Sequence, residues 1–225
     1  MSIIIINPNS TAAMTTAMCA AARGAAPGLS FDGWTSEDGP PAIQGAEDGA
    51  TATPPLLDLV RKAGREGAEG IVIGCFDDTA LAEAARIASC PVVGLGQASY
   101  HYCALRQWRF SVVTTLPVSV PVIEANIETM GLGGRLKRVR ASCVPVLDLE
   151  ADPEAALQPI LAEARAAAEN DGIDAVILGC AGMVGVTQTL RTTLEVSVVD
   201  PVEAAAQSMA WLTGQSGEVR LETSV

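Results

Sequence analysis

Two cysteines occupy equivalent places in two similar segments of this 225-residue chain. Cys75 ends the run Glu-Gly-Ile-Val-Ile-Gly-Cys, and Cys180 ends the run Asp-Ala-Val-Ile-Leu-Gly-Cys 105 positions later. A thiolate is an effective base and the protonated thiol is the matching acid. One such thiol in each half of the chain therefore indicates two opposed proton-transfer groups.

Each of these cysteines follows an apolar strand and precedes a helix. The strand fixes the position of the thiol, and the free N–H groups and positive end of the helix favour the thiolate. The alternative is a purely structural role, because free cysteine is often buried. The matched pair favours catalysis for Cys75 and Cys180. The other four have no counterpart at this offset, and we expect them to be small core residues: Cys19, Cys90, Cys103 and Cys143.

The repeat extends beyond the cysteines. At the same offset Arg86 pairs with Arg191, and Val93 pairs with Val198. A period of about half the chain implies duplication of a whole lobe, since solenoid repeats are only about 20 to 50 residues long. We therefore expect two pseudo-symmetric lobes that face each other.

Short apolar runs alternate with helical segments along the chain. This order is typical of an α/β protein, here with two lobes that each contain a mostly parallel sheet flanked by helices. The expected strands lie at 3–6, 70–74, 91–95, 109–114, 138–146, 173–178 and 196–199, and the clearest helices at 55–67, 79–88, 118–130, 153–170 and 202–212. Ligands of such folds bind at the carboxyl ends of strands, where Asn7, Cys75, Thr114 and Cys180 fall.

The predicted first lobe consists of residues 1–97 plus 205–225, with the final helix packing back on it, and the second lobe of residues 98–204. The active site is expected in the cleft between them. Residues 32–53 form the longest candidate loop, rich in Gly, Pro and Thr. A loop of this length is typical of a lid or of a surface excursion that contains a short strand, and the sequence leaves both open.

The residues that follow the two cysteines have the character of a substrate cradle. Phe76, Asp77, Asp78 and Thr79 follow the first cysteine, and 181–183 (Ala181, Gly182, Met183) follow the second. Small residues there allow backbone amides to approach a carbonyl or carboxylate and to stabilise an enolate. Alternatively, Asp78 or Thr79 caps the next helix and Asp77 faces solvent.

Composition excludes several other classes of protein. The absence of any Cys-x-x-Cys pair and the single histidine, His101, exclude most metal sites, and a Ser-His or Cys-His triad would have to use His101 itself. A net charge of −12 disfavours nucleic acid and anionic membranes as partners. No apolar run reaches the about 18 residues of a membrane span, and the start lacks the basic segment of a secretory signal, so we expect a cytoplasmic protein.

Three motifs resemble the aspartate/glutamate racemase superfamily, and within it the hydantoin and allantoin racemase branch. They are Asn-Pro-Asn-Ser-Thr at 7–11, Gly-Cys-Phe-Asp-Asp-Thr at 74–79 and Leu-Gly-Cys-Ala-Gly-Met at 178–183. Thr-Thr-Leu-Pro at 114–117 is similar to the motif that opens the second lobe of that branch. The chain lacks the Cys-Asn-Thr and Asp-Ser-Gly elements of glutamate racemases, which disfavours a free amino acid as substrate.

The resemblance implies racemisation without a cofactor or metal, by two bases in the interlobe cleft. Cys75 and Cys180 match the catalytic positions. Asn9, Thr115 and the loops 76–79 and 181–183 match elements that hold the substrate, and Thr114 adjoins them. The resemblance also implies a homo-oligomer that acts on a small molecule.

The expected reaction is racemisation of 5-monosubstituted hydantoins at C5. Allantoin is the alternative substrate, and the sequence does not separate the two. An arylmalonate decarboxylase would need only one cysteine, so the second counts against that relative. A small-molecule sensor of the same fold and a redox switch formed by the two thiols are the remaining alternatives, although binding lobes alone would not require matched cysteines.

Overall fold

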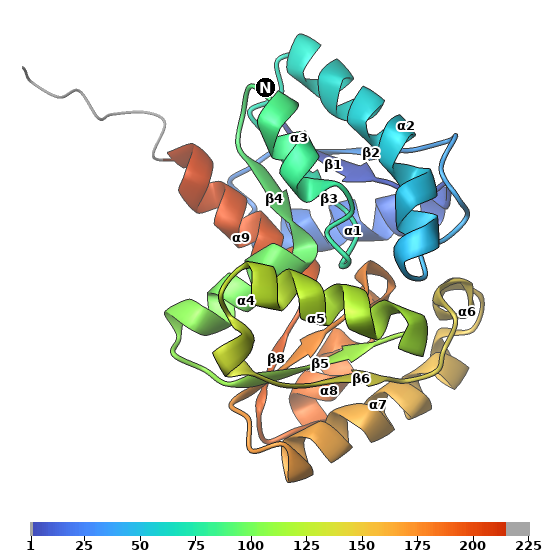
Figure 1. Cartoon of the computed structure of the whole chain (residues 1–225), viewed down its shortest axis with the longest axis vertical. Coiled ribbons are helices and arrows are strands. Elements are labelled where there is room, and N and C mark those ends of the chain that lie inside the picture. Colours follow the sequence, from blue (N-terminus) through green and yellow to red (C-terminus); the bar gives the residue numbers. More distant parts are fainter. Residues whose placement is uncertain (1, 215–225) are drawn as a thin grey trace, which may run out of the picture.

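The computed structural model describes residues 2–214 as two α/β lobes that lie one above the other (Figure 1). Each lobe contains a parallel sheet of four strands, which confirms the predicted fold class. The first sheet has the order β2-β1-β3-β4 and the second has the order β6-β5-β7-β8, so the strand order is the same in both. The strands are β1 (Ile3–Asn7), β2 (Phe31–Thr35), β3 (Gly70–Ile73), β4 (Val92–Gly94), β5 (Phe110–Thr114), β6 (Leu136–Ala141), β7 (Ala175–Leu178) and β8 (Ser197–Val199).

Helices cover both faces of each sheet, as parallel strands require. The α-helices are α1 (Ala12–Ala25), α2 (Ala46–Arg65), α3 (Leu81–Ile87), α4 (Leu95–Leu105), α5 (Val120–Thr129), α6 (Val146–Ala151), α7 (Pro153–Asn170), α8 (Thr187–Thr193) and α9 (Pro201–Gly214). Short 3-10 turns are η1 (Pro117–Ser119), η2 (Gly133–Arg135) and η3 (Ala181–Gly185). Among the described residues, no helix is long and apolar enough to cross a membrane.

The central strands of both sheets are buried along their whole length. Every residue of β1, β3, β5 and β7 is buried, because these apolar runs have neighbours on both sides and helices on both faces. In the first sheet Ile6 pairs with Ile73, and in the second Val113 pairs with Leu178. The strands therefore end in register, and the residues that follow them lie at one edge.

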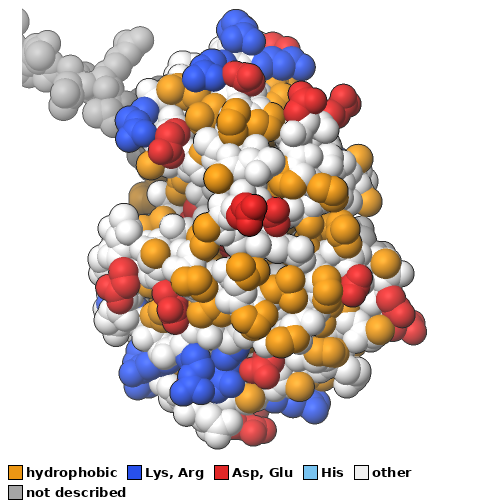
Figure 2. All heavy atoms as spheres, turned by 45° about the vertical axis from the view of Figure 1, so that its right-hand side comes forward, with side chains coloured by type: hydrophobic (Ala, Val, Ile, Leu, Met, Phe, Trp, Pro, Cys, Tyr) orange, Lys and Arg blue, Asp and Glu red, His pale blue; other side chains and the backbone are white. Residues whose placement is uncertain are grey.

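An apolar core joins the two lobes. The ring of Phe76 packs edge-on against Tyr100 of α4 at 5.6 Å, and Tyr100 stacks on Phe110 of β5 at 6.0 Å. The final helix α9 packs against α1, β3 and β4 of the first lobe and against α4, which connects the lobes (Figure 1). On the face shown in Figure 2, acidic side chains lie at the waist between the lobes, and basic ones gather toward the ends.

The structure differs from the sequence expectations at three elements of the chain. Residues 32–53 contain most of β2 and the first turns of α2, so only residues 36–45 form a loop. The helix expected to begin at Pro55 begins at Ala46 and carries Pro54 and Pro55 in its interior, where each removes a backbone donor. The strand expected at 138–146 ends at Ala141 and is followed by α6.

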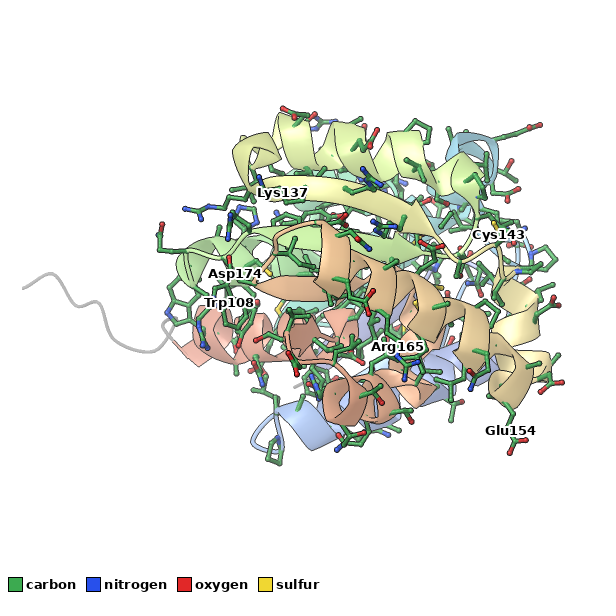
Figure 3. The ribbon with its side chains drawn as sticks, turned by 90° about the horizontal axis from the view of Figure 1, so that it is seen from below. Trp108, Lys137, Cys143, Glu154, Arg165 and Asp174 are labelled. Atoms are coloured by element: carbon green, nitrogen blue, oxygen red, sulfur yellow. The ribbon has the colours of Figure 1, made fainter. Side chains whose placement is uncertain are left out.

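Cys143 is not the core residue that the sequence predicted. Its side chain is exposed, and it follows β6 with a positive φ of 60°. Its backbone N–H donates to the carbonyl of Thr115 at 2.8 Å, so the chain turns sharply there. Figure 3 shows it at the opposite end of the second lobe from Trp108. Of the other three cysteines, Cys19 and Cys103 are buried, as expected, and Cys90 is partly buried.

Candidate active site

The two glycines before the cysteines hold the thiols at equivalent strand ends. The N–H of Gly74 donates to the carbonyl of Ile6 at 2.8 Å, and the N–H of Gly179 donates to the carbonyl of Val113 at 2.8 Å. A Cβ at Gly74 would lie 3.1 Å from the Ile6 oxygen, and one at Gly179 would lie 2.9 Å from the Val113 oxygen. Only glycine permits this close approach to the central strand, which explains the Gly-Cys pairs.

Both thiols border one small cavity between the lobes. Its volume is about 30 Å³, enough for about one or two water molecules. Seven other residues singled out in the sequence line it: Asn9, Phe76, Asp77, Thr114, Thr115, Ala181 and Gly182. Four lining residues were not anticipated, and no local pattern marks them: Met14, Ile43, Ser119 and Val146.

Cys75 is surrounded by polar groups of its own loop. The hydroxyl of Thr79 donates to its sulphur at 3.4 Å. Burial, followed by the charge of Asp77, raises the pKa of the Cys75 thiol well above its ordinary value, while hydrogen bonds from Thr79 and from the Asp77 backbone act in the opposite direction. Cys75 therefore rests as a protonated thiol in this closed arrangement.

Cys180 is the N-cap residue of η3. Its side chain accepts the backbone N–H of Gly182 at 3.4 Å, and only 9% of the residue is exposed. A Cβ at Gly182 would lie 2.9 Å from Leu149 Cδ1, so a glycine gives this loop the room to place its amide beside the sulphur. An N–H donor at this distance stabilises a thiolate.

Asn9 and Thr114 are held by side-chain hydrogen bonds. The Asn9 side-chain oxygen accepts the amide of Asn7 at 2.9 Å, and its own amide reaches only the sulphur of Met14 at 3.6 Å. Sulphur is a weak acceptor, so the Asn9 amide can exchange this contact for a stronger hydrogen bond to a ligand carbonyl. The hydroxyl of Thr114 donates to the carbonyl of Gly179 at 3.2 Å, while Thr115 is buried beside it.

Asp78 is placed away from the cavity by its contacts with a helix. Its carboxylate accepts the backbone N–H groups of Gly96 at 3.0 Å and of Gln97 at 2.7 Å, at the start of α4. Burial raises the pKa of Asp78 to about 8, against these two hydrogen bonds. It therefore caps α4 rather than the next helix, α3, whose N-cap is Ala80. Met183 is fully buried in the core and does not line the cavity.

Asp77 bridges the two lobes at the side of the cavity. Its carboxylate accepts the hydroxyl of Ser119 at 3.3 Å, and its carbonyl accepts the side-chain amide of Asn126 at 2.8 Å. Burial raises the pKa of Asp77 to about 6, whereas Ser119 and the backbone of Gly45 lower it.

The loop 36–45 covers the cavity from the first lobe and contacts the second. Ile43 borders the cavity, and the side-chain oxygen of Gln44 accepts the N–H of Val146 at 3.1 Å. Gly45, with φ of 96°, is close enough to Val118 that a Cβ would lie 2.8 Å from Val118 Cγ2. The loop therefore lies where a lid would, held by contacts that cross the lobes.

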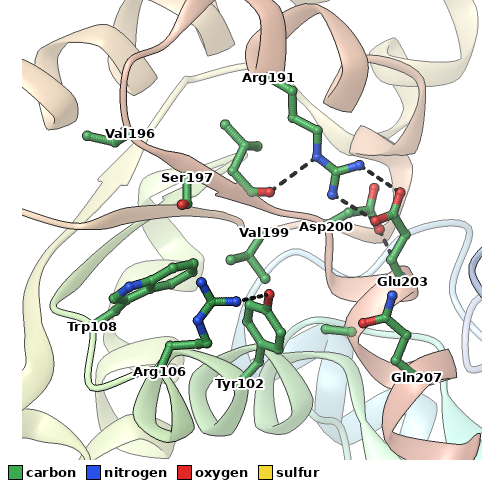
Figure 4. A pocket seen from close by; sticks show the side chains of 12 residues that line it. Tyr102, Arg106, Trp108, Arg191, Val196, Ser197, Val199, Asp200, Glu203 and Gln207 are labelled. Atoms are coloured by element: carbon green, nitrogen blue, oxygen red, sulfur yellow. Dashed lines mark hydrogen bonds and ion pairs between the residues drawn. The ribbon is translucent and has the colours of Figure 1, made fainter.

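A larger pocket lies elsewhere, between α4, β8 and α9, with a volume of about 550 Å³ (Figure 4). Its charged groups are mostly paired with one another. Arg191 makes two hydrogen bonds to Glu203 at 2.7 and 3.0 Å, and the guanidinium of Arg106 lies 4.3 Å from the ring of Trp108. No cysteine lines it, and within residues 2–214 no cluster of His, Cys, Asp or Glu is suited to hold a metal ion.

Comparison with known proteins identifies a single family. Residues 3–209 match the model of the Asp/Glu/Hydantoin racemase family. A hydantoin racemase of Rhizobium meliloti is 39% identical over 217 residues, which cover 95% of this chain and 89% of the relative. An allantoin racemase from Pseudomonas fluorescens superposes with a TM-score of 0.91 at 31% identity, covering 98% of this chain and 95% of that one. An allantoin racemase from Klebsiella pneumoniae gives 0.89 at 32% identity, with 96% and 89% covered.

Proposed function

We propose that this chain, which belongs to the Asp/Glu/hydantoin racemase family and is a racemase, inverts 5-monosubstituted hydantoins at C5 by a two-cysteine mechanism. The observation that carries the proposal is that two thiols at equivalent strand ends border one cavity. In one direction the Cys180 thiolate takes the C5 proton and leaves an enolate, and the Cys75 thiol returns a proton to the opposite face. The two groups then exchange roles, so the reverse direction uses the same pair.

The chemistry of the substrate supports a hydantoin over a free amino acid. The C5 proton of a hydantoin is the more acidic, because a ring carbonyl shares the enolate charge and there is no zwitterion to overcome. None of the described residues that line the cavity is Lys, Arg or His. A neutral or weakly acidic ring suits these walls, with the amides of Asn9 and Gly182 near developing negative charge. Thiols are adequate bases for such a proton, and the mechanism needs no cofactor.

Allantoin is a second candidate substrate, because allantoin racemases are among the structures that resemble this fold at about one third identity. Its ureido substituent is small and polar, whereas many hydantoins carry an apolar one. Relative kcat/KM for allantoin and for benzylhydantoin would separate the two candidates.

Substrate entry requires the site to open. A cavity of about 30 Å³ is smaller than a hydantoin ring, so the loop 36–45 and the segment before α6 must part before binding. The Gln44 to Val146 hydrogen bond is the contact that opening would break. Closure over the ring would then exclude water from the enolate.

The decisive experiment is a racemisation assay on single enantiomers of a small hydantoin panel that includes allantoin. Loss of optical rotation in D₂O, with one deuterium entering C5, is expected for the wild-type protein. Cys75→Ala and Cys180→Ala should each lower the rate by about a thousandfold, the scale of general acid or base catalysis. Cys143→Ala is the matched control, since this thiol is exposed outside the cavity.

Two outcomes would contradict the proposal. Racemisation that survives either cavity substitution would exclude a two-cysteine mechanism. Racemisation without deuterium at C5 would exclude proton transfer altogether. Tight binding of hydantoins without any isotope exchange would instead favour a sensor of the same fold, and a disulfide that forms between Cys75 and Cys180 on mild oxidation would favour a redox role.

We also propose that the enzyme is a cytoplasmic homo-oligomer with the lobe boundaries given above. Leu105 and Trp211 are large apolar side chains with exposed fractions of 75% and 62%, and they lie on α4 and α9 beside one groove. Exposed apolar surface of this kind supports association between subunits. Light scattering of the purified protein tests the subunit number, and a monomeric mass would contradict it.

A further inference from the structure

A second pocket adjoins the catalytic cavity. It has a volume of about 490 Å³ and lies between α2 and α3 of the first lobe and α5 of the second. Its lining includes Gly45, Thr53, Gln97, Asn126 and Thr129. Asp77 is the one described residue that lines both this pocket and the cavity with the two cysteines. The two spaces are therefore neighbours with Asp77 in their shared wall.

This wall is held by polar contacts across the lobes. Ser119 donates its hydroxyl to the Asp77 carboxylate at 3.3 Å, and Asn126 donates its amide to the Asp77 carbonyl at 2.8 Å. Gly45, whose backbone also favours the charged carboxylate, belongs to the loop that covers the cavity. Gly45 lines the pocket and Ser119 lines the cavity, so the contacts of Asp77 lie at the boundary between the two spaces.

The shared wall carries a carboxylate without a cationic partner. None of the described residues that line either space is Lys, Arg or His, whereas Asp77, Asp78 and Glu83 all contribute to the pocket. The waist between the lobes is likewise acidic in the view of Figure 2. A partly buried carboxylate that has only neutral hydrogen-bond donors is stabilised most by a nearby cation or by additional N–H donors. The lining of the pocket therefore suits a cationic or N–H-donating group better than an anionic one.

We propose that this pocket receives the C5 substituent of the substrate and that Asp77 is a specificity-determining residue, favouring substituents that end in an ammonium, a guanidinium or another N–H donor. The proposal rests on the proposed racemisation of hydantoins, because the ring must lie between the thiols for its substituent to reach Asp77. A flexible substituent then extends past Asp77 toward Thr53 and Asn126, which offer further polar contacts.

The test compares two substituents of the same shape. 5-(Aminobutyl)hydantoin and 5-pentylhydantoin differ by one terminal group, so the ratio of their kcat/KM values reports charge recognition. The wild-type ratio is expected to favour the aminobutyl compound. Asp77→Asn, which retains an oxygen to accept the Ser119 hydroxyl, should lower this ratio by on the order of tenfold to a hundredfold, as loss of a charge-assisted hydrogen bond does. The same ratio of dissociation constants, measured by calorimetry, does not depend on catalysis.

Glu83→Gln is the matched control, because it removes one negative charge at the outer rim of the same pocket, where the side chain is 50% exposed. It should change the ratio by less than about twofold, as exposed charges do. An equal effect of both substitutions would overturn the assignment of Asp77, and so would a wild-type preference for the pentyl compound. If neither compound is racemised but the binding ratio responds to Asp77→Asn, the reaction assignment fails and the subsite survives. Racemisation of both compounds, with a ratio that Asp77→Asn leaves unchanged, would exclude the subsite and leave the proposed reaction intact.

Discussion

The two cysteine loops have the same position and different surroundings. In both, a glycine amide bonds to the central strand at 2.8 Å and delivers the thiol to the cavity. The first loop then continues with Asp77, Asp78 and Thr79, whereas the second has Gly182 and Met183 at the positions equivalent to the two aspartates. The duplicated scaffold therefore sets where the thiols lie, and the loops give each thiol different neighbours.

The two lobes also differ in the aspartate that caps the helix after the last strand of the sheet. In the first lobe Asp78, from the cysteine loop, accepts two N–H groups at the start of α4. In the second lobe Asp200, at the end of β8, accepts those of Val202 and Glu203 at the start of α9. Both lobes therefore cap the helix after their last strand with an aspartate. In the first lobe this aspartate belongs to the cysteine loop, whereas in the second it follows β8, so the second cysteine loop has no acidic side chain.

The largest expected effect tests whether the two thiols serve opposite faces of the substrate. Cys75→Ser and Cys180→Ser should each lower racemisation by about a thousandfold. Each variant should still exchange the C5 proton of one enantiomer with D₂O, because the remaining thiol can remove and return it on one face. Nuclear magnetic resonance of each enantiomer measures this exchange. Retained exchange of the same enantiomer by both variants would show that the thiols are not opposed.

The next effect tests the two helix caps. Asp78→Ala and Asp200→Ala should each lower the free energy of unfolding by about 2 kcal/mol, since each leaves N–H groups at a helix start without their carboxyl acceptor. Urea denaturation measures both. Only Asp78→Ala is expected to lower kcat as well, because its loop carries Cys75. If both variants lost activity under conditions in which both are fully folded, the expected difference in kcat between the two caps would be contradicted.

A smaller effect tests the polar setting of Cys75. Thr79→Val removes the hydroxyl that donates to the thiol at 3.4 Å, so the pKa of Cys75 should rise further and kcat at neutral pH should fall by up to about tenfold. Thr79→Ser keeps the hydroxyl and should recover most of the rate. A valine variant with the wild-type pH–rate profile would show that the hydrogen bond does not act on the proton.

The smallest effect concerns the buried charge of Asp77. Its pKa is raised to about 6 in the folded protein, so between about pH 4 and 6 the native state binds more protons than the unfolded chain, and stability falls as pH rises. Asp77→Asn removes this dependence. Relative to wild type, the variant should gain on the order of 1 kcal/mol between about pH 4 and pH 6, with no further gain above.

Urea midpoints at several pH values measure the difference between the two proteins. Asp58→Asn is the control for loss of one surface carboxylate, because its exposed ion pair with Arg61 contributes little to stability. A stability difference between Asp77→Asn and wild type that does not change with pH would mean that the Asp77 carboxylate is as well solvated as a surface group.

Most strands and the paired thiols could be predicted from sequence because their signals are local. Four isoleucines in β1 and the apolar runs of β3 and β7 mark buried strands, and the helix at 153–170 was predicted with its observed bounds. The edge strand β2 is anticipated only as a short strand somewhere in residues 32–53, since Phe-Asp-Gly-Trp-Thr contains Asp and Gly and is only partly buried at the sheet margin. The prolines of α2 were interpreted as a helix start, which is their commonest helical position.

The rest of the site depends on distant contacts that no local pattern records. Ile43 reaches the cavity from a loop of the first lobe and Val146 from the start of α6 in the second, and Ser119 faces it because η1 ends beside Asp77. Asp78 was expected near the substrate or at the next helix. Its positive φ of 51° and that of Ala80 turn the chain instead, so the carboxylate meets a helix that begins at Leu95.

The small size of the cavity affects how the two thiols regain their protonation states between turnovers. Under the proposed two-cysteine mechanism, each inversion would leave the proton on the thiol that began as the base, so the product would depart from an enzyme in the wrong protonation state to repeat the same direction. A space of about 30 Å³ holds only about one or two water molecules that could carry this proton away. The unliganded protein must therefore reset before it can repeat the same direction. At high substrate concentration, this exchange of protonation states in the free enzyme, rather than proton transfer at C5, would limit the rate of racemisation. Until that exchange, the protonation state of the two thiols would still be the one set by the enantiomer last released.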